Sequence, residues 1–247
     1  MDKIDYLTVI YKNYDLLYLQ REQFDKLGIS NYRLIIVDNT PNSEYTHIEP
    51  RNNELIIRRE NNGGEFDGVS HGLALDLGIQ HCNSDIICVF DSDYFFLTDP
   101  TEYIKNKFDE GYLAIGAEFW NRSYLKNYDN FSHILKNIPC CFCGYYKKEL
   151  IQNLSWVVTQ NEVNWNTSYI EVGWRIRQHI NVNDIKTFGW QCKSDNNLNN
   201  FVYFDENGNT VGLHIVAGSH RSIGLTNNIK NYIAQTNLTN ATGKEIF

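Results

Sequence analysis

The chain has 247 residues, of which 42% are hydrophobic and 14% aromatic, and it carries a formal net charge of −8. This composition supplies a buried core and excludes a globally disordered chain. The acidic balance argues against a nucleic-acid-binding protein, which needs a basic surface to neutralise phosphates. A small anionic ligand stays possible, because one bound metal ion inverts the local field.

No apolar run approaches the roughly 20 residues of a membrane span. The longest run, residues 86–97, is interrupted by Asp91 and Asp93. The first three residues lead directly into a strand-like segment, without the pattern of a signal peptide. The cysteines lie in apolar stretches without paired C-x-x-C spacing, which indicates reduced core thiols. We therefore expect a cytoplasmic protein.

The first half of the chain alternates apolar strands with helices. Helical spacing predicts helices over residues 14–27, closed by Gly28, over 68–81, and after Asp99. Short apolar runs predict strands over 4–10, 33–37, 55–57, 85–90 and 112–117. Strands that are apolar throughout are buried on both faces, and their alternation with helices predicts a mostly parallel sheet. Ligands of such sheets bind beyond the carboxyl ends of the strands.

The second half is less regular. A short helix is predicted near residues 147–154, a longer one over 170–180, and a strand over 185–190. A hairpin is predicted over 201–216. From residue 226 onward the chain is polar and rich in asparagine, which indicates a tail or lid.

The acidic pair Asp91 and Asp93 follows the apolar strand 85–90. Two unpaired carboxylates at one strand end repel each other, and a divalent cation that bridges them to a phosphate removes that cost. Oxygen ligands of this kind suit Mg²⁺ or Mn²⁺. The alternative is that both side chains only cap the next turn. At this strand end we favour the metal site.

Other polar residues follow strands or begin helices. Asp38 could accept a hydrogen bond from a uracil ring N–H, or form an Asx turn that ends its strand. The glycine-containing stretch 60–68 could bring backbone N–H groups to a phosphate, or serve as a flexible connector. His71 could reach a phosphate, although a lone histidine on a helix is more often structural.

Three residues of the second half are further candidates. Glu171, at the start of the helix 170–180, is an ordinary capping residue or a general base above a sugar-binding cleft. His214 could complete a metal shell or be a satisfied core histidine. Arg221 could hold a phosphate through two hydrogen bonds.

Taken in this order, the segments resemble a GT-A glycosyltransferase of the large inverting, family-2-like group. In that family the second strand ends in an Asp that contacts the base, and an Asp-x-Asp triplet binds metal and diphosphate. Residues 143–150 resemble its acceptor-side strand and short helix. Its later acidic motif is matched by Glu171 with Arg177, and Gly173 replaces a second Asp.

The resemblance implies an α/β fold with a Rossmann-like, mostly parallel central sheet flanked by helices and a smaller mixed acceptor-side region. It implies one catalytic domain over 1–225, with a nucleotide-sugar half at 1–117, an acceptor half at 118–225, and a tail or lid at 226–247. The implied reaction moves a hexose from a nucleotide sugar, with UDP-glucose or UDP-galactose favoured, to an acceptor hydroxyl with inversion.

The resemblance also implies site residues. Glu171 would be the general base, and Asp91, Asp93 and His214 would hold Mn²⁺ or Mg²⁺. The implied nucleotide-sugar-binding residues are Thr8, Tyr11, Asp38, Asn62, Gly63, Gly64, His71, Asp91, Ser92 and Arg221. Two alternatives stay open: a sugar-phosphate nucleotidyltransferase, against which the lack of glycine in residues 11–15 counts, and a sugar-nucleotide-binding domain without catalysis.

Overall fold

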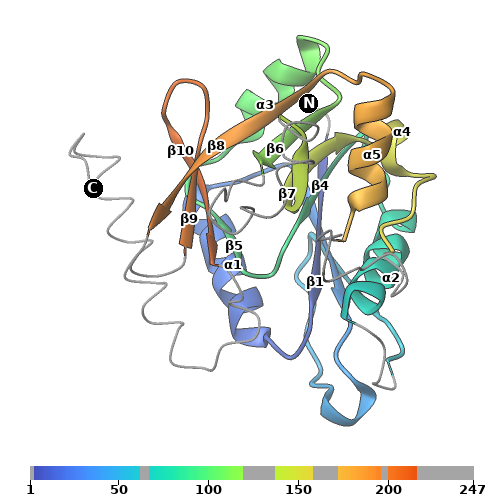
Figure 1. The fold of residues 1–247 in the computed structure, drawn as a ribbon. Coiled ribbons are helices and arrows are strands. Elements are labelled where there is room, and N and C mark those ends of the chain that lie inside the picture. The colour runs from blue at the N-terminus through green and yellow to red at the C-terminus, as the bar shows by residue number, and fades with distance from the viewer. Residues whose placement is uncertain (1–2, 62–66, 119–136, 158–171, 196–199, 216–247) are drawn as a thin grey trace.

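The computed structural model describes residues 3–61, 67–118, 137–157, 172–195 and 200–215 (Figure 1). Within these ranges, ten strands form one sheet with the order β3-β2-β1-β4-β7-β6-β8-β9-β10-β5. The strands are β1 (Ile4–Ile10), β2 (Tyr32–Asp38), β3 (Glu54–Arg58), β4 (Ile86–Phe90), β5 (Tyr94–Phe96), β6 (Ala114–Glu118), β7 (Pro139–Lys147), β8 (Thr187–Asp195), β9 (Asn200–Phe204) and β10 (Thr210–Ile215). The helices are α1 (Tyr14–Leu27), α2 (Asp67–Gln80), α3 (Thr101–Asp109), α4 (Lys148–Ile151) and α5 (Trp174–Val182), with a 3-10 turn η1 (Asn42–Glu44).

The periodicity of the first half predicts its elements correctly except for β5, which was not expected. The expected strands correspond to β1, β2, β3, β4 and β6, and the expected helices to α1, α2 and α3. α1 ends as predicted at Gly28, whose φ of 65° is left-handed. There the N–H groups of Gly28 and Ile29 donate to the carbonyls of Asp25 (3.1 Å) and Phe24 (3.2 Å), which satisfies the end of the helix.

The prediction of a mostly parallel sheet is wrong. β1 pairs in parallel with β2 and β4, β2 with β3, and β6 with β8. In contrast, β7 lies between β4 and β6 and is antiparallel to both. The remaining neighbours in the sheet are also antiparallel: β8 with β9, β9 with β10, and β10 with β5. An apolar run indicates that a strand is buried but carries no information about its direction. The regular alternation with helices that justified the parallel prediction ends after α3.

Side chains of β1 alternate between two hydrophobic layers. Tyr6 and Ile10 belong to the layer that contains Leu17 and Phe24 of α1. Leu7 and Val9 belong to the other layer, with Ala74 and Leu75 of α2. α1 and α2 therefore cover opposite faces of the sheet, as Figure 1 shows on the two sides of β1. This burial on both faces explains why the central strands are apolar throughout.

The cysteines are free thiols, all of them buried except the half-buried Cys192. This agrees with the expectation of reduced core residues. Among the helices that the structure describes, none combines the length and apolar character needed to cross a membrane.

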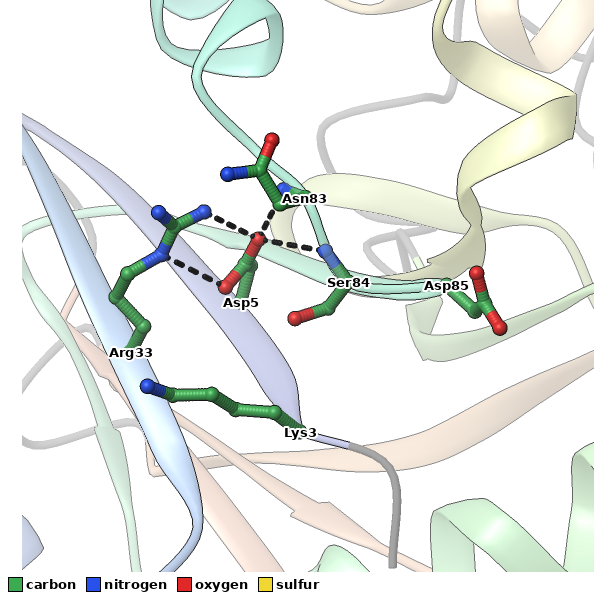
Figure 2. A pocket seen from close by; sticks show the side chains of 6 residues that line it. All are labelled: Lys3, Asp5, Arg33, Asn83, Ser84 and Asp85. Carbon is green, nitrogen blue, oxygen red and sulfur yellow. Dashed lines mark hydrogen bonds and ion pairs between the residues drawn. The ribbon is translucent and has the colours of Figure 1, made fainter.

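Asp5 organises the edge of the sheet where β1 begins (Figure 2). Its carboxylate accepts hydrogen bonds from Arg33 Nε (3.0 Å) and Nη2 (2.8 Å) and from the N–H groups of Asn83 (2.5 Å) and Ser84 (2.9 Å). These contacts tie β1, β2 and the segment before β4 together. An open hollow of about 370 Å³ lies here, lined by Lys3, Asp5, Arg33, Asn83, Ser84 and Asp85.

Candidate functional site

The polar segments that follow β1, β2 and β4 meet at the opposite edge, where these parallel strands end. The Lys12 N–H donates to Thr40 Oγ1 (2.9 Å), which joins the ends of β1 and β2. Asn13 Nδ2 donates to Ser92 Oγ (2.6 Å), which joins the ends of β1 and β4. Lys12 has a left-handed φ of 61°, a strained conformation that is concentrated at functional sites.

Asp91, Asp93 and His214 form a cluster at this edge. Each offers a possible ligand atom, and these atoms lie within 4.8 Å of one another. His214 Nε2 lies 3.3 Å from Asp93 Oδ1 and 3.9 Å from Asp91 Oδ2. The antiparallel pairing of β10 with β5 sets His214 opposite Tyr94. The structure thus brings together the three residues that the sequence analysis named as metal ligands.

The turn that carries the acidic pair is held by backbone hydrogen bonds. The Tyr94 N–H donates to the Asp91 carbonyl (3.0 Å), and the Ile215 N–H donates to the Asp93 carbonyl (3.1 Å). From α1, Gln20 Nε2 donates to the carbonyls of both Asp91 (3.0 Å) and Tyr94 (3.1 Å). Contacts with α1 and β10 therefore fix the backbone from which the two carboxylates project.

The charges of this cluster are partly removed from water. The side chains of Asp93 and His214 are only 6% and 7% exposed. Burial alone would lower the pKa of His214, but the hydrogen bond with Asp93 and the charges of Asp93 and Asp91 raise it above its usual value. The two acidic side chains therefore favour the protonated form of His214 when no cation is bound.

His71, on α2, lies beside the same cluster. Its Nε2 is 3.9 Å from Asp91 Oδ1. Although 32% of the side chain is exposed, burial of the ring lowers the pKa of His71 to about 4, and the charge of Asp93 opposes this only in part. His71 is therefore neutral at pH 7 and can form hydrogen bonds there without carrying a positive charge.

Asp38 forms an Asx turn, which is one of the two roles predicted for it from the sequence. Its Oδ1 accepts the Thr40 N–H (3.0 Å), and its Oδ2 accepts the Tyr14 hydroxyl (3.3 Å). Arg58 Nη1 lies 3.4 Å from Oδ1, and the Asp38 side chain is fully buried. A nucleobase would reach this carboxylate only after Tyr14 or Arg58 had moved, so contact with uracil stays a prediction.

Of the other predicted site residues, Thr8 and Tyr11 lie in the part of the chain that the structure describes. Thr8 is buried within β1, two residues before the strand ends. Within the described ranges its hydroxyl has no hydrogen-bond partner. Tyr11 directly follows β1 and is 40% exposed at the edge. The remaining predictions lie outside the described residues: Asn62, Gly63, Gly64, Glu171 and Arg221.

Gly173 stands where the resembled motif has an Asp, and the structure gives the physical reason for glycine there. The residue precedes α5 with a left-handed φ of 81°. A Cβ atom at this position would lie 2.8 Å from the Trp156 ring. A larger side chain would therefore displace the indole.

Three further residues shape the site and were not predicted from the sequence: Asn13, Gln20 and Phe142. Phe142, on β7, accepts the Asp91 N–H with its carbonyl (2.9 Å). Its ring stacks on the His214 imidazole, with centroids 4.5 Å apart and planes at 17°. Only the pairing of β7 with β4 and of β10 with β5 brings these segments together, so local sequence carries no signal for these contacts.

No family model matches the chain, and no curated protein matches it. Among solved structures, it is similar to mannosyltransferase PcManGT from Pyrobaculum calidifontis in complex with GDP-Man and Mn²⁺ (13% identity, TM-score 0.43, 62% of this chain and 46% of that chain). It is also similar to S. aureus TarS 1-349 in complex with UDP-GlcNAc (14% identity, TM-score 0.47, 72% and 54%) and to S. aureus TarS (11%, 0.49, 72% and 34%). The matched region spans between 34% and 54% of the length of these proteins.

Proposed function

We propose that this chain is a metal-dependent glycosyltransferase that moves a hexose from a nucleotide sugar to an acceptor hydroxyl, with inversion at the anomeric carbon. The observation that carries the proposal is the cluster of Asp91, Asp93 and His214 within 4.8 Å. It lies at the edge where β1, β2 and β4 end, and this is the edge at which such sheets bind ligands.

The donor set of the cluster fits a divalent cation. Two carboxylates and one imidazole can each supply one ligand atom, and the buried Asp93 gains a counter-charge when a cation binds. The two carboxylates suit both Mg²⁺ and Mn²⁺. When bound, the cation supplies a Lewis acid for the negative charge that develops on the leaving nucleoside diphosphate.

The chain's own residues would hold and orient the donor. Neutral His71, 3.9 Å from Asp91, can donate a hydrogen bond to a phosphate oxygen or a sugar hydroxyl. The segments around Tyr11, Asp38 and Ser92 would hold the nucleoside, with UDP-glucose or UDP-galactose as the proposed donor. Glu171 would take the proton from the acceptor hydroxyl, and Arg221 would contact the diphosphate.

The test compares Asp93→Asn, which removes the charge and keeps the shape, with Asp184→Asn as the matched control. Asp184 is exposed and lies in the segment after α5. Hydrolysis of UDP-glucose and UDP-galactose in Mn²⁺ needs no acceptor and is measured as release of UDP. We expect Asp93→Asn to lose about 100-fold or more of the rate, and the control to retain it.

The products separate this proposal from the two alternatives. Release of pyrophosphate would indicate a nucleotidyltransferase, and binding without any turnover would indicate a domain that has lost catalysis. A folded Asp93→Asn protein that turned over a UDP-sugar at the original rate would refute the metal assignment.

A further inference from the structure

We infer that Phe142 is a positioning residue for the proposed metal site, because it contacts two of the three candidate ligands. Its carbonyl holds the backbone of Asp91 and its ring holds the imidazole of His214. The inference rests on the proposed function, since it concerns how tightly the cluster binds a cation. It adds a residue that carries no ligand atom of its own.

The backbone contact extends the pairing of β4 with β7 into the acidic turn. The last paired residues of these strands are Phe90 and Cys143. The hydrogen bond from the Asp91 N–H to the Phe142 carbonyl (2.9 Å) continues the ladder by one step. Asp91 therefore leaves the strand in a fixed direction, whatever side chain stands at position 142.

The ring contact restrains the other side of the cluster. The Phe142 and His214 rings are nearly parallel, at 17°, with centroids 4.5 Å apart. A stacked partner limits rotation of the imidazole about the bond that joins it to Cβ. This rotation decides whether Nε2 points toward Asp93, from which it now lies 3.3 Å.

The second nitrogen of His214 shows why the stack is needed. A metal-binding histidine usually donates its other ring N–H to an acceptor, which fixes the orientation of the ring. Within the described residues, buried Nδ1 of His214 has no hydrogen-bond partner. The Phe142 ring, stacked on the face of the imidazole, is thus the contact that restrains its orientation, and loss of this ring should weaken cation binding without removing a ligand.

The experiment measures the affinity for Mn²⁺ alone, by electron paramagnetic resonance or calorimetry, without nucleotide and without turnover. Phe142→Leu and Phe142→Met remove the ring, while Phe142→Tyr keeps it. Phe188→Leu is the matched control, because Phe188 on β8 is also half-buried and packs against Tyr112 instead. Thermal unfolding of each variant identifies those that fold.

We expect Phe142→Leu and Phe142→Met to bind Mn²⁺ about 10-fold more weakly than wild type, which is the lower end of the effect of removing an outer-shell partner. Phe142→Tyr and Phe188→Leu should bind as wild type does. In a His214→Ala background, Phe142→Leu should cause no further loss, because the ring acts through the imidazole.

Three results would overturn the inference. One is wild-type affinity in folded Phe142→Leu and Phe142→Met, and another is an equal loss in Phe142→Tyr. The third is a further 10-fold loss in the His214→Ala background, which would show that the ring does not act through His214. Each of these leaves the proposed function standing, whereas wild-type protein that binds no Mn²⁺ would remove both.

Discussion

At the residue scale, the two histidines beside the acidic pair show that contacts with the carboxylates decide whether a buried imidazole has a lowered or a raised pKa. Burial lowers the pKa of both. For His71, which lies 3.9 Å from Asp91, burial prevails and the pKa falls to about 4. For His214, the hydrogen bond with Asp93 and the nearby acidic charges prevail and the pKa rises. The same acidic pair therefore accompanies opposite shifts in the pKa of the two imidazoles, because only His214 hydrogen-bonds with a carboxylate.

Asp5 gives a prediction for the dependence of stability on pH. Burial raises its pKa, but the hydrogen bonds from Arg33, Ser84 and Asn83 outweigh this and hold the pKa below its usual value. The folded state therefore gains stability from the ionised carboxylate above the unfolded pKa of about 3.9. That gain is lost as the pH falls through the lower, folded value.

We expect Asp5→Asn to reduce the free energy of unfolding by about 2–3 kcal/mol at pH 7, because it leaves Arg33 and two N–H groups with poorer acceptors. The gap between wild type and variant should narrow below about pH 4. Urea unfolding at several pH values measures it, with exposed Asp184→Asn as the control. A gap of the same size at pH 7 and pH 3 would contradict the assignment.

At the scale of elements, the sequence predicts a strand or helix where the pattern is local. α1 is an example, because apolar spacing and Gly28 mark its course and end. The direction of β7 was not predictable, because it depends on the pairing of β7 with β4 and β6 and not on the residues of β7 alone. β5 was missed because a tight turn at Asp91–Tyr94 separates it from β4 within one apolar stretch.

The docking of α2 against the segment 155–157 gives a prediction at this scale. Asp76 on α2 accepts the Trp156 N–H (2.7 Å) and the Ser155 hydroxyl (2.7 Å). One turn earlier, a Cβ added to Gly72 would lie 2.5 Å from Val157 Cα and 2.7 Å from the Trp156 carbonyl oxygen. Gly72 therefore allows backbone to pack on backbone, and no side-chain rotation can relieve the overlap.

We expect Gly72→Ala to destabilise the fold by about 1–2 kcal/mol. Alanine is favoured over glycine within a helix by about 1 kcal/mol, but overpacking against a fixed backbone costs about 1–3 kcal/mol or more. Chemical denaturation measures the difference, and Leu73→Ala at the neighbouring, exposed position serves as control. A Gly72→Ala protein more stable than wild type would show that the helix preference wins and that the segment 155–157 yields.

At the scale of the whole molecule, the candidate site depends on contacts between distant parts of the chain. Asp91 and Asp93 were predictable as a pair, since they follow a buried strand. The proximity of His214 came only from the family resemblance, because its place depends on the pairing of β10 with β5. Phe142 and Gln20 had no signal at all, since their roles arise from contacts across the sheet and from α1.

The most direct measurement of the central claim is an anomalous diffraction map from crystals of this protein soaked with Mn²⁺ and UDP. We expect a manganese peak among the carboxylates of Asp91 and Asp93 and Nε2 of His214, in contact with the pyrophosphate of the nucleotide. A well-ordered UDP bound elsewhere, with no manganese between these three side chains, would contradict the account.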